Sequence, residues 1–523
     1  MSQQFEFKDR KVKYKEIKVL DANGETVESF NASISDVVEE GEEGTPLNAE
    51  NLNAMKNGIK SELKEELKEC LQEDTSDENN DQLSSEMNFK KIVCTGNTTN
   101  KEISKVVNSF FNDSNYSDNA TLTLKIVGDV NITDEHLAGY VNSKTNPARF
   151  FDLGVKGYEG DKRVIIDWTE ANIAEKTYSI TPNQWASCFN VAFVYNACKG
   201  ITHLGLKVKF TFQVVSTSFT DAYGTVATAI LGDYIEVVGG EIKVNSKSTW
   251  SGQSGSGGAE GINSNNSKIK DCTVKAEHVG RGRAVAYVGN YNQYTDCVVA
   301  EVTSDSGADY GFYTNYSTHK QCKSTATQGV VIYGYRGNCN HYVSCEANAT
   351  NSEINTSISH GFMGENNDYD RCTSKASNKY GYGYSGSSNR YTYCTALGIG
   401  NANGTDNGTG VGIMGANSMV LGCTLMGYDE DGLSVFGYKS KSGSEGSYHM
   451  IRDCVFKRVV SDNHDGTNGR AIYIDDASLS QAYVIEGNLI DKDIVEISGI
   501  EPNDVNYLYR SNVHTLALTH TLG

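Results

Sequence analysis

From about residue 120 onward, short apolar runs alternate with turns that are rich in Gly, Asn, Ser and Asp. Examples of the runs are KRVIIDW at 162–168, FNVAFVYN at 189–196 and YIEVVGGEIKV at 234–244, and nothing long in this region is helical. Many short strands with turns between them are typical of a β sandwich, a barrel, a propeller or a β solenoid. The period of the sequence repeat decides between these alternatives.

A cysteine recurs behind an asparagine and an aromatic residue, as in NYNQYTDC at 290–297 and NYSTHKQC at 315–322. The intervals run from 22 to 31 residues, over Cys272, Cys297, Cys322, Cys345, Cys372, Cys394, Cys423 and Cys454. A repeat of this length has room for two or three strands. It is too short for a four-stranded propeller blade, which takes about 40 to 45 residues. It fits one coil of a parallel β-helix, in which each column stacks on the previous coil.

Other columns keep the same register. Eleven residues before the cysteine stands a glycine, and the next residue is always large: Gly261/Ile262, Gly311/Phe312, Gly334/Tyr335, Gly361/Phe362, Gly383/Tyr384 and Gly412/Ile413, with Ala286/Tyr287 in the one gap. We expect the cysteines to be inward core residues rather than reactive thiols, because a thiol in an apolar column has a raised pKa. The asparagines are expected in turns, where a side-chain amide satisfies the bending backbone.

The N-terminal region has a different pattern. KVKYKEIKVL and ETVESFNASI read as strands around the turn at 21–24. An apolar stripe at helical spacing follows a candidate N-cap at Asn48, and consists of Leu52, Met55, Ile59, Leu63, Leu67 and Cys70. It suits a short coiled coil or a helix packed on its own domain. The chain thus divides into a small N-terminal β unit (1–46), a helical neck with an acidic linker (47–90), a strand–helix–strand cap (91–127), the β-helix (128–510) and a C-terminal tail (511–523).

Composition narrows the function. The formal net charge of -20 argues against nucleic-acid binding, which needs clusters of Lys and Arg. No apolar run is long enough to insert into a membrane, and the N-terminus lacks a signal peptide's apolar core. Thirteen cysteines without that signal read as thiols, and neither CxxC nor zinc spacing is present. We therefore expect no metal and no cofactor.

The repeat columns resemble the right-handed parallel β-helix proteins, which include pectate lyases and bacteriophage tail spikes. The segment EGTPLNAENLNAMKNGI at 43–59 resembles one that is common in tail-associated proteins of phages and prophages. This resemblance implies a receptor-binding tail spike or fibre of a phage or phage-derived particle. It implies a homotrimer in the virion tail that is made in the bacterial cytoplasm and attaches to tail or baseplate proteins by its N-terminal unit. Outside the host cell, this spike would bind a bacterial surface polysaccharide.

The tyrosines are the main candidates for glycan contact, because 15 of the 30 lie between residues 280 and 395. A narrow solenoid interior is not expected to hold them all, and exposed Tyr offers a flat apolar face with a hydroxyl. An interface between the chains of a trimer is the other reading. The predicted glycan-binding residues are Tyr310, Tyr313, Tyr333, Tyr335, Tyr382, Tyr384, His341 and Arg390.

The alternative function is a polysaccharide depolymerase, either a glycoside hydrolase or a lyase; a free-standing polysaccharide enzyme ranks third. Hydrolysis usually needs two carboxylates roughly 5 to 10 Å apart. The candidates are Asp309, Glu365 and Asp368. In the column four residues before the cysteine, Asp368 stands between His341 and Arg390, which suits a saccharide site or a solvated face with paired charges.

The oligomeric state tests the spike interpretation directly. We expect size-exclusion chromatography with light scattering to give three times the chain mass of 57.0 kDa. A monomer of that chain mass would contradict the spike interpretation.

Overall fold

The computed structural model describes residues 15–20, 26–32, 89–95, 98–133, 148–154, 158–180, 188–215, 224–248, 257–280, 282–305, 307–351, 358–400, 409–429, 435–440, 448–458, 469–473, 482–491, 495–498, 507–510 and 512–515. It divides the chain into two units, Met1–Asn88 and Phe89–Gly523. In the first unit, β1 (Lys15–Leu20) and β2 (Thr26–Ala32) pair antiparallel, which confirms the two strands predicted around the turn at 21–24. The predicted neck and linker (47–90) lie outside the described residues, except for residues 89 and 90, which belong to the first strand of the second unit.

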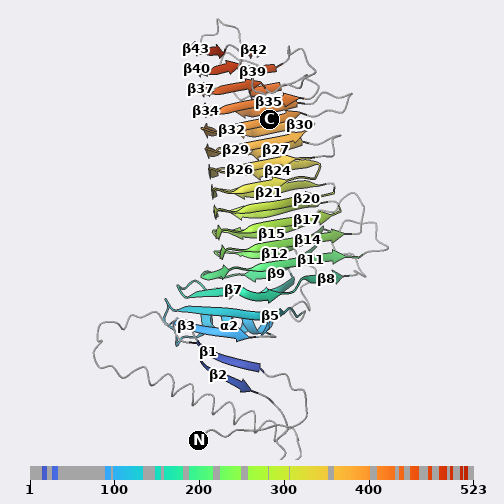
Figure 1. Cartoon of the computed structure of the whole chain (residues 1–523), viewed down its shortest axis with the longest axis vertical. Helices are drawn as coiled ribbons and strands as arrows, with labels where there is room; N and C mark the ends of the chain where they lie inside the picture. The colour runs from blue at the N-terminus through green and yellow to red at the C-terminus, as the bar shows by residue number, and fades with distance from the viewer. Residues whose placement is uncertain are drawn as a thin grey trace, which may run out of the picture. The chain divides into compact units, whose positions relative to one another are not determined.

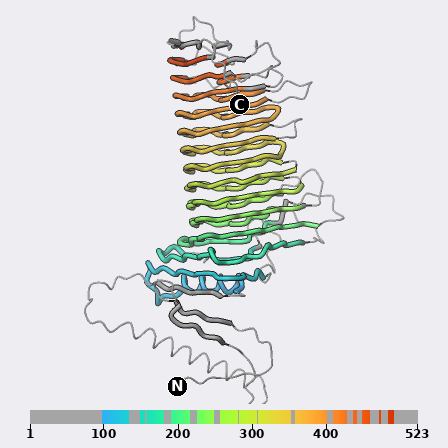
Figure 2. The backbone as a smooth tube through the Cα atoms, viewed as in Figure 1, coloured from blue at the N-terminus to red at the C-terminus, as the bar shows by residue number. Residues whose placement is uncertain are grey.

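The second unit is a right-handed parallel β-helix, as predicted, and its coils stack one on another along the chain (Figures 1 and 2). From β7 onward, each coil passes in turn through three parallel sheets. In the part that the structure describes, sheet 1 consists of β3 (Phe89–Thr95), β4 (Thr98–Thr99), β5 (Thr121–Asn131), β7 (Arg163–Ile173), β10 (Ile201–Leu204), β13 (Glu236–Val238), β16 (Lys268–Lys270), β19 (Gln293–Thr295), β22 (Thr318–Lys320), β25 (His341–Val343), β28 (Asp368–Asp370), β31 (Arg390–Thr392), β34 (Met419–Leu421), β37 (Tyr448–Arg452), β40 (Ala482–Glu486) and β43 (Tyr507–Arg510).

From β10 to β36, sheets 2 and 3 hold the longer strands of each coil. Sheet 2 consists of β8 (Lys176–Ile180), β11 (Lys207–Val214), β14 (Glu241–Ser248), β17 (Thr273–Val279), β20 (Val298–Ser304), β23 (Lys323–Ala326), β26 (Glu346–Thr350), β29 (Thr373–Asn378), β32 (Thr395–Gly400), β35 (Thr424–Asp429), β38 (Val455–Arg458), β41 (Leu489–Asp491) and β44 (Val513–Thr515). Sheet 3 consists of β6 (Ala148–Asp152), β9 (Cys188–Asn196), β12 (Gly224–Asp233), β15 (Gly257–Asn265), β18 (Gly282–Asn290), β21 (Ala308–Asn315), β24 (Val331–Arg336), β27 (Ile358–Met363), β30 (Tyr380–Ser387), β33 (Thr409–Ala416), β36 (Val435–Ser440), β39 (Gly469–Tyr473) and β42 (Val495–Ser498).

The first coil carries the one helix among the described residues, α2 (Asn100–Asn112). Thr99 caps it: its hydroxyl accepts from the Glu102 N–H at 3.2 Å, and the Glu102 carboxylate accepts from the Thr99 N–H at 2.8 Å. The apolar face of α2 joins the core of the coils. The predicted boundary at 127/128 falls inside β5, and β44 falls within the predicted C-terminal tail, so both ends belong to the same solenoid.

From β10 to β34 the strands of sheet 1 are short because a left-handed residue stands at each end of them. Tyr291 (φ 58°) precedes β19 and Asp296 (φ 53°) follows it, and most coils from β16 to β34 repeat this pair. Positive φ is unfavourable for residues with a side chain. Here the corner N–H groups are hydrogen bonded to the next coil, Tyr291 to the Asn315 carbonyl and Asp296 to the Lys320 carbonyl, each at 3.0 Å. Two sharp corners therefore enclose four residues in each of these coils, and the last three of them form the strand.

The asparagine behind the first corner points inward and ties neighbouring coils together. The Asn367 Oδ1 accepts from the Asn340 N–H at 2.8 Å, and its Nδ2 donates to the Gly337 carbonyl at 2.9 Å and to the Tyr369 hydroxyl at 3.1 Å. Asn292, Asn340 and Asn389 repeat this arrangement. The prediction that these amides satisfy the turning backbone is confirmed.

The recurring cysteines line the interior, as predicted: all eight are at most 1% exposed. In a typical coil the Cys297 thiol contacts the carbonyls of Thr295 at 3.4 Å and Ile269 at 3.3 Å. Burial raises the pKa of the Cys272 thiol to about 12. These thiols are core groups.

Two aromatic columns fill the rest of the interior. Rings stack along the axis with centroids 4.5 to 5.0 Å apart, over Tyr287, Phe312, Tyr335, Phe362 and Tyr384 in one column and Tyr294, His319, Tyr342, Tyr369 and Tyr391 in the other. The interior therefore holds more tyrosine than the sequence led us to expect. It does so because rings one coil apart lie face to face and take little width. Among the described residues, no helix is both long and apolar enough to cross a membrane.

Replacing one asparagine of the interior ladder tests its contribution to stability. Asn367→Ala should lower the stability by about 2 to 4 kcal/mol, because the Asn340 N–H, the Gly337 carbonyl and the Tyr369 hydroxyl each lose a buried partner. The midpoint of thermal unfolding, followed by circular dichroism, measures the change.

The matched control is Asn338→Ala. Asn338 is exposed, and its Oδ1 accepts from the Glu365 N–H at 2.8 Å, so water can replace this bond and we expect a loss below about 1 kcal/mol. Equal losses in the two variants would contradict the assigned role of the buried ladder.

Candidate functional site

The strands of sheet 3 bend at the recurring glycine. A Cβ on Gly311 would lie 1.8 Å from the Ser324 Oγ of sheet 2, so no side chain fits there. Phe312, the next residue, also points into the core, and the inward–outward alternation is broken. As a result Tyr310 and Tyr313 both face outward and approach each other, with ring centroids 5.1 Å apart.

Because the strands of successive coils pair in register, the residues at these two outward positions form two columns along sheet 3. The first outer column consists of Thr228, Glu260, Val285, Tyr310, Tyr333, His360 and Tyr382. The second outer column consists of Leu231, Asn263, Val288, Tyr313, Arg336, Met363 and Ser385. The two columns run side by side over seven consecutive strands, β12 to β30.

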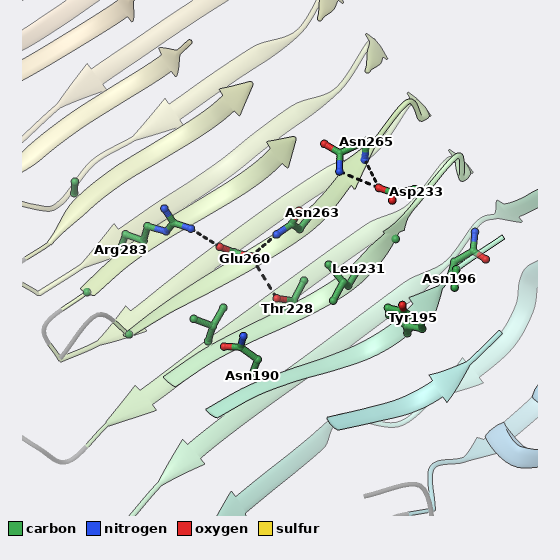
Figure 3. A pocket seen from close by; sticks show the side chains of 16 residues that line it. Asn190, Tyr195, Asn196, Thr228, Leu231, Asp233, Glu260, Asn263, Asn265 and Arg283 are labelled. Atoms are coloured by element: carbon green, nitrogen blue, oxygen red, sulfur yellow. Dashed lines mark hydrogen bonds and ion pairs between the residues drawn. The ribbon is translucent and has the colours of Figure 1, made fainter. Parts of the chain in front are cut away.

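The N-terminal half of these columns forms a polar pocket of about 950 Å³, lined by residues of β9, β12, β15, β18 and β21 (Figure 3). Glu260 lies at its centre and is 4% exposed. Its Oε1 accepts from Arg283 at 2.7 Å, and its Oε2 accepts from Asn263 at 2.8 Å and from the Thr228 hydroxyl at 3.4 Å. Both carboxylate oxygens are thus engaged, and Glu260 orients an amide and a guanidinium in the pocket.

A second polar pair lies farther along the same strands. The Asp233 Oδ1 accepts from both the backbone N–H and the side-chain amide of Asn265, at 3.2 and 2.9 Å. Glu260 and Asp233 are the carboxylates among the residues that line the pocket, and they belong to separate hydrogen-bond networks. The pocket offers amides, carboxylates and a guanidinium that can donate to and accept from hydroxyl groups.

The C-terminal half of the first outer column is an aromatic ladder made of Tyr310, Tyr333, His360 and Tyr382. Successive ring centroids are 5.0, 5.2 and 5.0 Å apart, with interplanar angles of 6°, 5° and 16°. Because each ring covers its neighbour's face, and Tyr310 and Tyr333 are 8% exposed, only a small part of each ring, along its edge, is accessible from the outside. The expectation that these tyrosines offer flat faces to a sugar is therefore wrong.

Arg336 lies beside this ladder in the second outer column. Its guanidinium donates to the Tyr310 hydroxyl at 2.8 Å and lies 5.0 to 5.5 Å from the ring centroids of Tyr310, Tyr313 and Tyr333. Burial raises the pKa of the Tyr333 and Tyr382 hydroxyls, which keeps both protonated. The ladder thus presents neutral hydroxyls next to a fixed cation.

The structure separates the predicted glycan-binding residues into three groups. Tyr310, Tyr313, Tyr333 and Tyr382 lie on the outer columns. The prediction is wrong for Tyr335 and Tyr384, which are 0% exposed in the interior stack and cannot contact a glycan. The last two residues, His341 and Arg390, lie on sheet 1.

On sheet 1 the predicted ladder of His341, Asp368 and Arg390 does form, because β25, β28 and β31 are neighbours in register. The Asp368 carboxylate accepts from Arg390 Nε at 2.8 Å and from a second nitrogen of the same guanidinium, and it lies 3.3 Å from His341 Nδ1. The Arg390 hydrogen bond holds the pKa of Asp368 below its usual value. Asp368 is a paired carboxylate on a different sheet from the pocket.

The three predicted catalytic carboxylates do not form one site. Asp309 is 0% exposed: its Oδ2 accepts from the Ser304 N–H at 3.1 Å, and its Oδ1 has no partner among the described residues. Glu365 is exposed in the turn between β27 and β28, and Asp368 is on β28. The prediction of Asp309 as a catalytic residue is wrong, because the core encloses its carboxyl and substrate cannot reach it.

Sequence reasoning missed Glu260, Asn263, Arg283 and Arg336. A signal for three of them was present: Glu260 stands twelve residues before its cysteine, whereas Asn263 and Arg336 stand nine before theirs. These are the two outer columns. The bend at the glycine, which makes both columns face outward, is visible only in three dimensions.

No protein-family model matches this chain, and no curated protein matches it. Solved structures do. A mannuronan C-5 epimerase A-module from Azotobacter vinelandii is 11% identical, with a TM-score of 0.31, over 68% of this chain and 90% of that one. A periplasmic alginate epimerase is 10% identical, with a TM-score of 0.29, over 81% and 85%. The Dettilon tailspike protein is 11% identical, with a TM-score of 0.25, over 61% and 64%.

The enclosed carboxyl of Asp309 predicts a pH-dependent stability. Burial raises its pKa to about 8 from an ordinary value of 3.8, so between these values the folded protein holds a proton that the unfolded chain releases. The contribution of Asp309 to stability is therefore lost as pH rises from about 4 to about 8. Asp309→Asn should become progressively more stable relative to wild type over this range, by up to about 1.4 kcal/mol per pH unit.

Thermal unfolding of both proteins between pH 5 and pH 9 measures this. Asp368→Asn is the control: because the pKa of Asp368 is depressed, its contribution to stability falls only below about pH 4, so the difference between this variant and wild type should stay constant from pH 5 to pH 9. A difference between Asp309→Asn and wild type that stays constant with pH would contradict the assignment.

Proposed function

We propose that the protein binds a polysaccharide along the outer face of sheet 3, with the sugar chain crossing successive coils. The observation that carries this proposal is the register: the polar pocket and the aromatic ladder occupy the same two columns over β12 to β30. One continuous face thus combines a pocket that binds hydroxyls with a row of tyrosine edges.

The chemistry of this face suits a long polyhydroxylated ligand. Strands of neighbouring coils are about 4.8 Å apart, so each coil offers another outward side chain at a regular spacing. Buried contacts hold these groups in place: Arg283, Asn263 and Thr228 are fixed on Glu260, and the ladder rings are fixed on one another. A preorganised array loses little conformational entropy on binding, which favours affinity.

Binding, rather than hydrolysis, is the function that these residues support. Glu260 is fully engaged by its three partners, Asp309 is enclosed, and Asp368 is paired on sheet 1. A hydrolase would need two free carboxylates facing one bond.

The sequence adds the biological setting to this proposal. The phage-like segment at 43–59 and the order of a small head, a neck and a β-helix support a tail spike or tail fibre of a phage or phage-like particle. In that setting the N-terminal unit attaches to the tail or baseplate, three chains associate, and sheet 3 binds a glycan of the bacterial surface during host recognition.

Two tyrosines two residues apart on β24 allow a matched test. Tyr333→Phe removes a hydroxyl from the outer ladder and should weaken glycan binding about 3- to 10-fold, which corresponds to one hydrogen bond. Tyr335→Phe removes a hydroxyl that points into the core and has no hydrogen-bond partner among the residues that the structure describes, so it should leave binding unchanged.

An array of bacterial capsular, O-antigen and cell-wall polysaccharides, followed by titration of the glycans bound, measures both variants against wild type. If wild type binds no glycan, the proposal is wrong. If the two variants lose affinity equally, binding does not occur on this face.

A further inference from the structure

We infer that the glycan bound on this face carries an anionic substituent, a carboxylate or a phosphate, which Arg336 binds. The inference rests on the proposed function and names the chemical class of its ligand. It follows from the way in which the chain holds this guanidinium.

The three tyrosines around Arg336 fix it in place. Tyr310, Tyr313 and Tyr333 surround the guanidinium at 5.0 to 5.5 Å from their ring centroids, where the negative ring faces attract a cation. The Tyr310 hydroxyl accepts one N–H at 2.8 Å. An arginine held in this way loses little further entropy when it binds an anion.

Arg336 has no acidic partner among the described residues, in contrast to other arginines of the coils. Arg283 is paired with Glu260 at 2.7 Å, and Arg390 is paired with Asp368. The guanidinium has five N–H donors, and the Tyr310 hydroxyl is the acceptor that the described residues provide. The remaining donors suit a carboxylate or phosphate, which an arginine can bind through two parallel hydrogen bonds.

The neighbouring groups of the ladder favour the same ligand. His360 is the next ring after Tyr333 in the ladder. Its burial and the nearby charge of Arg336 lower the pKa of His360 to about 3, so the imidazole is neutral and Arg336 is the cation beside the ladder. The Tyr310 hydroxyl accepts from Arg336 and keeps its own proton for donation. An anion here meets a fixed positive charge and a hydroxyl donor together.

Three polymers distinguish a carboxylate ligand from a phosphate ligand. Polygalacturonate carries carboxylates, its carboxyl-reduced form is neutral, and glycerol-phosphate teichoic acid carries phosphates. Binding of each to the full chain is measured by isothermal titration calorimetry at low and high salt. We expect one charged polymer to bind at least about ten-fold more tightly than the neutral one, with a preference that weakens as salt rises.

Arg336→Gln should abolish this preference, and Arg336→Lys should retain part of it, because lysine keeps the charge without the two-pronged geometry. Arg390→Gln is the control: it removes the same charge from sheet 1 and should bind as wild type does. Circular dichroism confirms that each variant is folded.

The outcomes separate the two proposals. Equal binding of charged and neutral polymers, binding of neither charged polymer, or a preference that survives Arg336→Gln overturns the inference. In each case the proposed function still stands if the polysaccharide array shows binding that Tyr333→Phe weakens and Tyr335→Phe does not. Absence of any glycan binding overturns both.

Discussion

Hydrogen bonding between successive coils is the constraint on which the rest of this structure depends. In the β-helix, each strand between the two ends of its sheet pairs in parallel with the strand one coil before it and the strand one coil after it. Corners obey the same rule, since even the left-handed residues at the ends of the short strands donate their N–H groups to the next coil. A residue at a given point of the coil therefore stacks on its counterpart, and the choice of side chain is made column by column.

Inside the solenoid this constraint favours side chains that stack. Asparagine amides close the corners by bridging one coil's backbone to the next, and thiols occupy a position with little room. Aromatic rings lie face to face at 4.5 to 5.0 Å, so a narrow interior accommodates many of them. The same arrangement keeps His319 neutral between Tyr294 and Tyr342, because burial lowers its pKa to about 4.

On the outer surface of the solenoid, the residue type can change from coil to coil within a column, and the residues that could bind a ligand lie there. The glycine column brings sheets 2 and 3 so close that sheet 3 must bend, and the bend brings two outward columns together. Along these columns the residues change from the Glu260 network to the tyrosine ladder beside Arg336. A regular scaffold thus carries an irregular surface that can recognise one polymer, while sheet 1 carries its own paired charges at Asp368.

The sequence by itself determined the coil, its approximate length, and the inward cysteine and asparagine columns. It could do so because register repeats make a column visible as a spacing. It also determined that His341, Asp368 and Arg390 are neighbours. Only the tertiary structure decided which columns face outward, because the bend at Gly311 breaks the simple alternation of a strand. That bend placed Phe312 and Tyr335 inside and left Tyr310 and Tyr313 on the same outer face, and it joined Glu260 and Arg336 on that face by packing between sheets that no local pattern encodes.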